Sequence, residues 1–214
     1  PQGKVDHPHL KEQLYANLEK DQLVVDVGCG TGPFEYEDYG CRFIAFDMFD
    51  PESTEGLVAG RDEFRKARLE EFPLEDGSAD AVVLGFILEH VEKPLDFLRE
   101  AERVLRTGGW CYVAVPHFRS LEDRLFRAAT KFAGSSRGPH IQKFTIKNLH
   151  TLIEGNTSFR VQAWHPLRAS FLWMNHPKLR WVRKPFIAVL RGLGVLGYDG
   201  FSDANYQLLL RKTT

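Results

Sequence analysis

The chain has 214 residues, 43% of them hydrophobic and 27% charged, with a formal net charge of −1. This length is enough for one domain with a substantial core and short for two, and the composition is that of an ordinary globular protein. Cys29, Cys41 and Cys111 are odd in number and lack metal-ligand spacing, so a reducing cytosol fits better than a disulfide framework or a zinc site. No stretch reaches the ~20 apolar residues of a membrane-spanning helix, and residues 1–20 are too polar for a signal peptide.

The small net charge conceals an uneven distribution. Residues 1–123 contain 26 acidic and 13 basic residues, whereas residues 124–214 contain 3 acidic and 15 basic residues. The two parts therefore carry net charges of −13 and +12. A basic segment of this kind indicates either an anionic partner or internal pairing with the acidic part.

Strands and helices alternate along the first part of the chain. Leu10, Leu14 and Leu18 recur at helical spacing and predict a helix within residues 1–21. Short apolar runs predict strands at 23–27, 41–47, 81–85 and 110–115, with a short helix over 33–39 and a longer one over 94–106 that Gly108 and Gly109 terminate. This alternation predicts a doubly wound α/β fold with a mostly parallel sheet, whose ligand lies at the carboxyl ends of the strands.

Beyond Pro116 the pattern is looser. We expect a helix over 147–154, a strand over 159–164 and a last strand over 205–212. The basic, aromatic-rich stretch 165–203 is long for a connection between two neighbouring strands, and we predict that it is a helical insertion.

The most informative motif follows the first predicted strand. D-V-G-C-G-T-G at 26–32 places glycines at alternate positions, so the main chain can turn sharply and leave room for a ligand. In the dinucleotide-binding motif G-x-G-x-x-G the third glycine would fall at Pro33, which disfavours a nicotinamide oxidoreductase. Asp47 ends the next strand, where a carboxylate can accept both hydroxyls of a ribose, and Met48 and Phe49 offer apolar surface to an adenine.

Two further stretches extend the pattern: A-R-L-E-E-F-P-L-E-D-G-S-A-D-A-V-V at 67–83 is followed by L-E-H-V at 88–91. Together with the glycine motif and Gly108-Gly109, in this order, they make residues 22–116 resemble the type 11 group of class I, Rossmann-like methyltransferases. The resemblance implies S-adenosylmethionine as cofactor and a seven-stranded sheet with an antiparallel last strand. It divides a single domain, 1–214, into an N-terminal helix (1–21), a cofactor-binding half (22–116) and an acceptor half (117–214).

The resemblance also implies which residues bind the cofactor. They are Asp26, Gly28, Cys29, Gly30, Gly32, Asp47, Met48, Arg68, Leu69, Gly85 and Phe86. Arg68 departs from the family pattern, because an acid that meets the adenine amino group stands there in the family. The main chain of Leu69 can still contact the ring.

Methyl transfer requires little from a protein, because the sulfonium is already activated. An in-line approach and, for a hydroxyl acceptor, a general base supply most of the catalysis. The candidate bases are His90, His117 after the strand 110–115, and His140 in the stretch H-I-Q-K-F-T, with a structural role as the alternative for each. We interpret Glu89 and His90 as residues that fix the loop over the cofactor. No cluster of metal ligands appears, so no metal is expected.

The sequence predicts a small or lipid-like acceptor, methylated at oxygen or carbon, and the alternative is a module that binds S-adenosylmethionine without catalysis. No nucleic-acid recognition motif appears, so no nucleic-acid partner is expected. Two interpretations of the insertion 165–203 remain open. It is either a lid that packs on the acidic first part, or the peripheral contact of a cytoplasmic protein with an anionic membrane surface.

Overall fold

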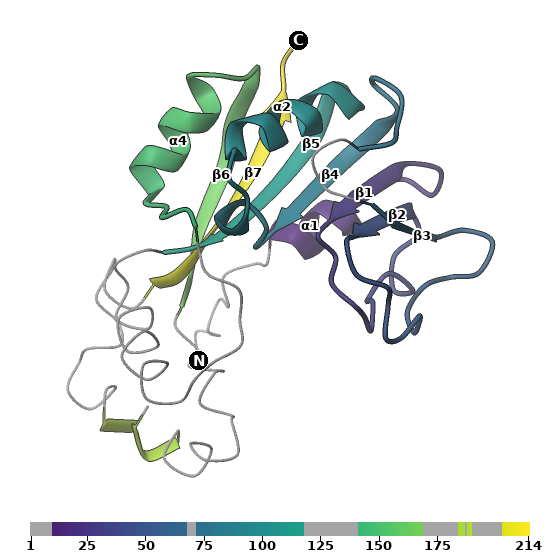
Figure 1. Cartoon of the computed structure of the whole chain (residues 1–214), viewed down its shortest axis with the longest axis horizontal. Helices are drawn as coiled ribbons and strands as arrows, with labels where there is room; N and C mark the ends of the chain where they lie inside the picture. The colour runs from purple at the N-terminus through teal and green to yellow at the C-terminus, as the bar shows by residue number, and fades with distance from the viewer. Residues whose placement is uncertain (1–9, 68–71, 118–140, 169–183, 187, 190–202) are drawn as a thin grey trace, which may run out of the picture.

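The computed structural model describes residues 10–67, 72–117, 141–168, 184–186, 188–189 and 203–214 (Figure 1). In chain order its elements are α1 (Leu10–Ala16), β1 (Leu23–Val27), β2 (Arg42–Asp47), β3 (Glu63–Lys66), β4 (Ala79–Gly85), the 3-10 turn η1 (Leu88–His90), α2 (Pro94–Val104), β5 (Leu105–Pro116), α4 (Ile146–Glu154), β6 (Phe159–Arg168) and β7 (Asp203–Lys212).

The strands form one seven-stranded sheet in the order β3-β2-β1-β4-β5-β7-β6. β7 runs antiparallel to both of its neighbours, and the other strand pairs are parallel. This confirms the predicted α/β fold with its mostly parallel sheet and antiparallel last strand. The chain moves outward from β1 to β2 and β3 and then crosses to β4 on the other side of β1. The strand order therefore reverses between β1 and β4, and in sheets of this kind ligands bind at the carboxyl ends of the strands at such a point.

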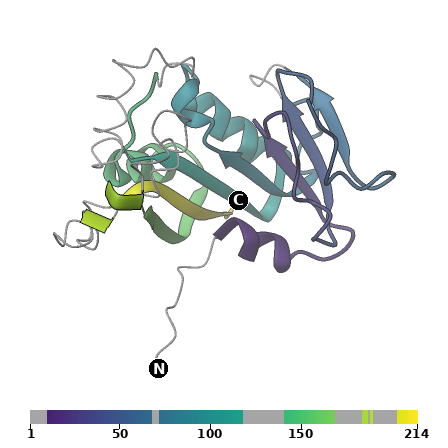
Figure 2. The same ribbon diagram turned by 90° about the horizontal axis from the view of Figure 1, so that it is seen from below.

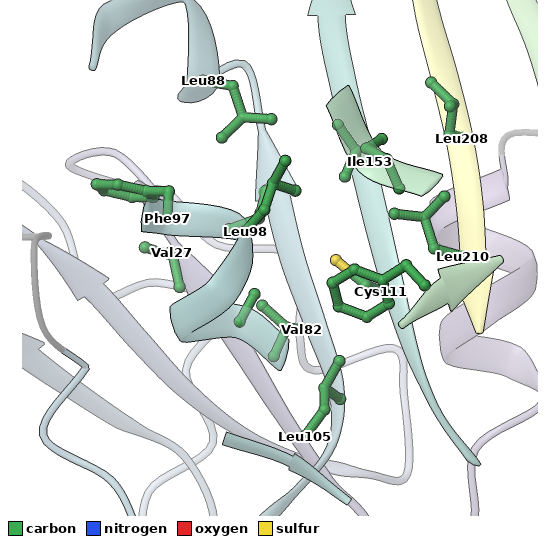
Figure 3. Close-up of a cluster of buried hydrophobic side chains, with 14 of the residues drawn as sticks. Val27, Val82, Leu88, Phe97, Leu98, Leu105, Cys111, Ile153, Leu208 and Leu210 are labelled. Atoms are coloured by element: carbon green, nitrogen blue, oxygen red, sulfur yellow. The ribbon is translucent and has the colours of Figure 1, made fainter. Parts of the chain in front are cut away.

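Helices cover both faces of the sheet. α2 and α4 pack on one face and α1 on the other (Figure 2). Alternate residues of β1 supply the two cores, because Val25 and Val27 face α2 and α4 while Val24 faces α1. Figure 3 shows the first core, where Leu98 of α2 and Ile153 of α4 are fully buried against the strands. Burial of one such side chain contributes about 1.5–3 kcal/mol of stability.

The segment after the glycine loop differs from the prediction, because residues 33–39 form no helix. Phe34 and Tyr36 are buried while the acidic residues beside them are exposed, and this alternation of period two belongs to an extended chain. The N–H of Phe34 donates to the carbonyl of Glu55 at 2.7 Å. Gly56 lies so close that a Cβ there would stand 1.6 Å from the Phe34 oxygen. Pairing with this second segment therefore replaces the helix.

The end of α2 and the strand β3 also differ from the prediction. α2 ends at Val104, because Leu105 is extended and pairs with Ala79 of β4, so Gly108 and Gly109 lie within β5 instead of terminating the helix. β3 was not predicted at all. Three of its four residues are charged, as is common in an edge strand, and the apolar criterion used for the other strands misses it.

The insertion starts later than predicted. β6 continues to Arg168 and β7 begins at Asp203, so 165–168 belong to a strand. Of the rest of the stretch 165–203, the structure describes 184–186 and 188–189, which are helical, and the first residue of β7. Within the described ranges, no helix combines the length and the apolar character needed to cross a bilayer.

Candidate active site

The glycine motif forms the loop that leaves β1 at the point where the strand order reverses (Figure 1). The N–H groups of Gly28 and Cys29 donate to the carbonyl of Phe46 at 2.8 and 3.1 Å, which holds the loop against the end of β2. Gly30 has a φ of +81°, and a Cβ at this position would meet nothing within 4 Å. The main chain is therefore open to a ligand at Gly30, in a conformation that favours glycine.

Asp47, the last residue of β2, is fixed to this loop. Its side chain is only 7% exposed. Oδ2 accepts the N–H of Gly30 at 2.9 Å, and Oδ1 accepts the N–H of Phe49 at 3.0 Å. Because a carboxylate oxygen can accept two hydrogen bonds, each oxygen retains the capacity for one more. Two adjacent acceptors of this kind suit the paired hydroxyls of a ribose.

Apolar side chains are exposed on both sides of the loop. Met48 and Phe49 follow Asp47 and are 54% and 61% exposed, and Phe86 follows β4 and is 42% exposed. Phe86 has a φ of +57°, which is unusual for a residue with a side chain, and its N–H donates to the carbonyl of Ala114 at 2.9 Å. Such conformations cost about 1–3 kcal/mol and are concentrated at binding sites.

A second carboxylate, Asp26 in β1, lies near the loop. It is 8% exposed, and the hydroxyl of Tyr36 donates to its Oδ2 at 2.8 Å. Burial raises the pKa of Asp26, and the Asp47 carboxylate raises it further, whereas Lys11 and the Tyr36 hydrogen bond lower it. Burial and the same two carboxylates raise the pKa of the Cys29 thiol, so this cysteine stays protonated and is a poor nucleophile.

The remaining predicted residues divide into two groups. Gly32 in the glycine loop and Gly85 beside Phe86 lie near the carboxyl ends of β1 and β4. His117 directly follows β5 and is buried, and its ring centroid lies 4.6 Å from that of Tyr206 in β7. Arg68, Leu69 and His140 lie outside the described residues. The structure thus brings the predicted cofactor residues together at one edge of the sheet, apart from Arg68 and Leu69.

The sequence did not single out Glu89 as a candidate acid or base. It lies in η1 and is 2% exposed, and its Oε2 has no hydrogen-bond partner among the described residues. Burial raises the pKa of Glu89 to about 7. Its main-chain carbonyl accepts the N–H groups of Ile141 and Gln142 at 2.8 and 3.1 Å. An acid that follows the apolar run 86–88 was the available signal, but nothing in the sequence showed that it would be buried.

Known proteins resemble this chain in sequence and in fold. Residues 25–113 match the family model described as a methyltransferase domain. The thiol S-methyltransferase TMT1B of Homo sapiens is 35% identical over 108 residues, 44% of each chain, and that of Mus musculus is 31% identical over 159 residues, 65% of each chain. The chain therefore spans less than two thirds of the length of these relatives. The solved structure of geranyl diphosphate C-methyltransferase from Streptomyces coelicolor has a TM-score of 0.64 at 14% identity, covering 94% of this chain and 78% of that one, and so shares the fold.

The fold and the family match lead to the same assignment. They identify residues 25–113 as a class I, Rossmann-like methyltransferase domain, the class that uses S-adenosylmethionine as methyl donor. The matching family model is that of the type 11 group, which confirms over residues 25–113 the resemblance seen in the sequence.

Proposed function

We propose that the chain binds S-adenosylmethionine across the glycine loop and transfers its methyl group to a small or lipid-like acceptor. The observation that carries this proposal is the attachment of Asp47 to Gly30, which leaves each carboxylate oxygen able to accept a ribose hydroxyl. Met48 and Phe49 would lie against the adenine. The bound sulfonium supplies an activated methyl group, so the tasks left to the protein are to bind, to orient and to exclude water.

The acceptor would lie on the side of the loop that faces β4 and β5. Phe86 and Ile141 expose 42% and 49% of their surface there, and Ile141 is joined to the turn after β4 through the carbonyl of Glu89. This apolar surface favours an acceptor with a hydrophobic part. Oxygen and carbon are the acceptor atoms predicted from the sequence, and the names of the TMT1B relatives add sulfur.

An O–H or S–H acceptor must lose its proton to a base. His117 is a candidate at the end of β5, and His140 remains a second one from the sequence. Glu89 adds a third, because a buried carboxyl with a pKa of about 7 is partly ionised near neutral pH and can take up a proton.

Replacement of Asp47 tests cofactor binding. In Asp47→Ala the affinity for S-adenosylhomocysteine should fall by roughly 100-fold or more, because two hydrogen bonds to a buried carboxylate are lost and each is worth about 1.5–3 kcal/mol. Calorimetric titration of the folded protein measures this. Asp50→Ala is the matched control, since it removes an exposed carboxylate, paired with Lys66, three residues further on. Folded Asp47→Ala protein with wild-type affinity would rule out the placement.

Turnover separates an enzyme from a module that only binds the donor. Methyl-labelled S-adenosylmethionine would be incubated with an alkyl thiol, a phenol and an isoprenoid alcohol. Label in one product identifies the acceptor atom, whereas donor binding without labelled product from any acceptor, including extracted lipids, favours the non-catalytic module.

Membrane contact of the basic insertion stays a prediction from its charge. Cosedimentation with anionic but not neutral liposomes, weakened by salt, is the expected result, and absence from both would leave the lid interpretation.

A further inference from the structure

The partner of Asp26 comes from the segment that replaces the expected helix. Tyr36 is 4% exposed, and its ring stacks on Phe43 of β2 with a centroid distance of 4.1 Å and an interplanar angle of 3°. The carbonyl of Tyr36 accepts a hydrogen bond from Nη2 of Arg61 at 2.7 Å. Both the ring and the main chain of this residue are therefore held in place, and its hydroxyl is fixed at 2.8 Å from Oδ2 of Asp26.

Asp26 is a costly residue to bury. Removing a carboxylate from water is unfavourable unless hydrogen bonds or an opposite charge compensate. The charged group that lowers its pKa is Lys11 of α1, and Asp47 acts in the opposite direction. Tyr36 donates one hydrogen bond to Oδ2, and because each carboxylate oxygen can accept two, the carboxylate retains the capacity for a further hydrogen bond from a ligand.

The two carboxylates stand on neighbouring strands beside one loop. Asp26 pairs with Ala45 in the register of β1 and β2, and Asp47 lies two residues beyond Ala45. The methyl donor carries a ribose diol in its adenosine part and an ammonium group in its methionine part. With the diol on Asp47, the other carboxylate offers the opposite charge that an ammonium group requires.

We propose that Tyr36 is a positioning residue, which orients the carboxylate of Asp26 to receive the ammonium group of the methyl donor. This inference rests on the proposed function. In a class I fold the helix after the glycine loop would cover this face of the sheet. Here the extended segment 33–39 covers it and also supplies the hydroxyl that fixes the carboxylate.

Two ligands that differ only at the amino-acid end test the inference. S-adenosylhomocysteine carries the ammonium group, and 5′-methylthioadenosine keeps the adenosine and the thioether but lacks it. In Tyr36→Phe the affinity of the full chain for S-adenosylhomocysteine should fall by roughly 10-fold or more, because the carboxylate of Asp26 is no longer held in the orientation that its charge-assisted bond to the ammonium group requires. The affinity for 5′-methylthioadenosine should stay within about twofold of wild type, as expected for a ligand without that contact.

Tyr39→Phe is the matched control, because Tyr39 belongs to the same aromatic cluster and contacts Phe43 but donates no hydrogen bond to Asp26 in the described structure. It should alter the affinity for neither ligand. Asp26→Asn should repeat the selective loss of S-adenosylhomocysteine affinity, which keeps the test valid if Tyr36→Phe does not fold. Equal losses for both ligands would show a general loosening of the loop, and no loss for either would show no link to the ammonium group; both overturn the inference. A wild-type chain that binds neither ligand would instead refute the proposed function.

Discussion

The crossover from β1 to β2 and the crossover from β4 to β5 cover opposite faces of one sheet in different ways. The second uses a helix, α2, which buries Phe97 and Leu98 against the strands (Figure 3). The first uses an extended chain whose aromatic side chains lie on the other face, with Tyr36 stacked on Phe43. The same topology therefore accepts either a helix or an aromatic layer as the cover of a sheet face.

The difference lies in where the hydrogen bonds of the main chain are satisfied. A helix satisfies its own groups, whereas an extended segment needs partners from elsewhere in the molecule. Here the carbonyl of Glu55 accepts the N–H of Phe34, and the guanidinium of Arg61 donates to the carbonyls of Tyr36 and Tyr39. We therefore expect the crossover without a helix to tolerate substitution less well at its contact points.

The largest effect should come from Gly56, where the extended segment touches its partner. Gly56→Ala would place a Cβ 1.6 Å from the carbonyl oxygen of Phe34, so the main chain must shift. We expect a loss of roughly 3–5 kcal/mol in the free energy of unfolding, or no folding at all. Gly60→Ala is the matched control, because Gly60 also has a positive φ, +78°, but has open space around it. It should cost about 1 kcal/mol.

Chemical denaturation of the two glycine variants measures this difference. Equal losses for Gly56→Ala and Gly60→Ala would mean that the positive φ alone matters and that the close approach contributes nothing. In that case the extended crossover would not depend on its contact with the second segment.

The buried acids near the two crossovers also differ in their hydrogen-bond partners. Asp26 has the Tyr36 hydroxyl as partner, whereas Oε2 of Glu89 has none among the described residues and its Oε1 lies 3.9 Å from Nε2 of His90. The pKa of Glu89 is raised from 4.5 to about 7, so the folded state holds its proton more tightly than the unfolded state does. The corresponding stability is present at low pH and is lost as the pH rises through about 7.

Glu89→Gln removes this pH-dependent cost. Relative to wild type, the variant should gain roughly 2–3 kcal/mol in the free energy of unfolding between pH 5 and pH 8.5. Denaturation at the two pH values measures the gain, and Glu92→Gln, an exposed glutamate three residues along, should show none. A pH-independent difference for Glu89→Gln would mean that its carboxyl titrates normally. If Glu89→Gln lowers turnover while it raises stability, the buried carboxyl of Glu89 takes part in the reaction at a cost in stability.

The placement of the proposed cofactor residues at one edge of the sheet could be predicted, because these residues follow apolar strands in order. The glycine loop comes after β1, Asp47 ends β2 and Phe86 follows β4, so the topology of a parallel sheet brings them to one edge. β3 escaped prediction because its pattern is charged, and its strand character comes from pairing with β2.

The roles proposed for Tyr36 and Glu89 could not be predicted from the sequence for a different reason. The contact of Tyr36 with Asp26 requires an extended chain where the pattern indicated a helix, and the segment that enforces it begins near Glu52. The main chain of Glu89 is joined to Ile141, far along the sequence. Both roles depend on contacts between distant segments, which local patterns do not contain.

The position of β7 has a consequence for how such a molecule can diversify. Because β7 lies between β5 and β6 and runs against both, the chain leaves the sheet at Pro116 and Arg168 and returns at Asp203 at the edge that carries the glycine loop. Sequence gained, lost or exchanged at these points interrupts no pairing within the sheet. Insertions there can therefore change the acceptor, while the strands proposed to hold the methyl donor stay unaltered.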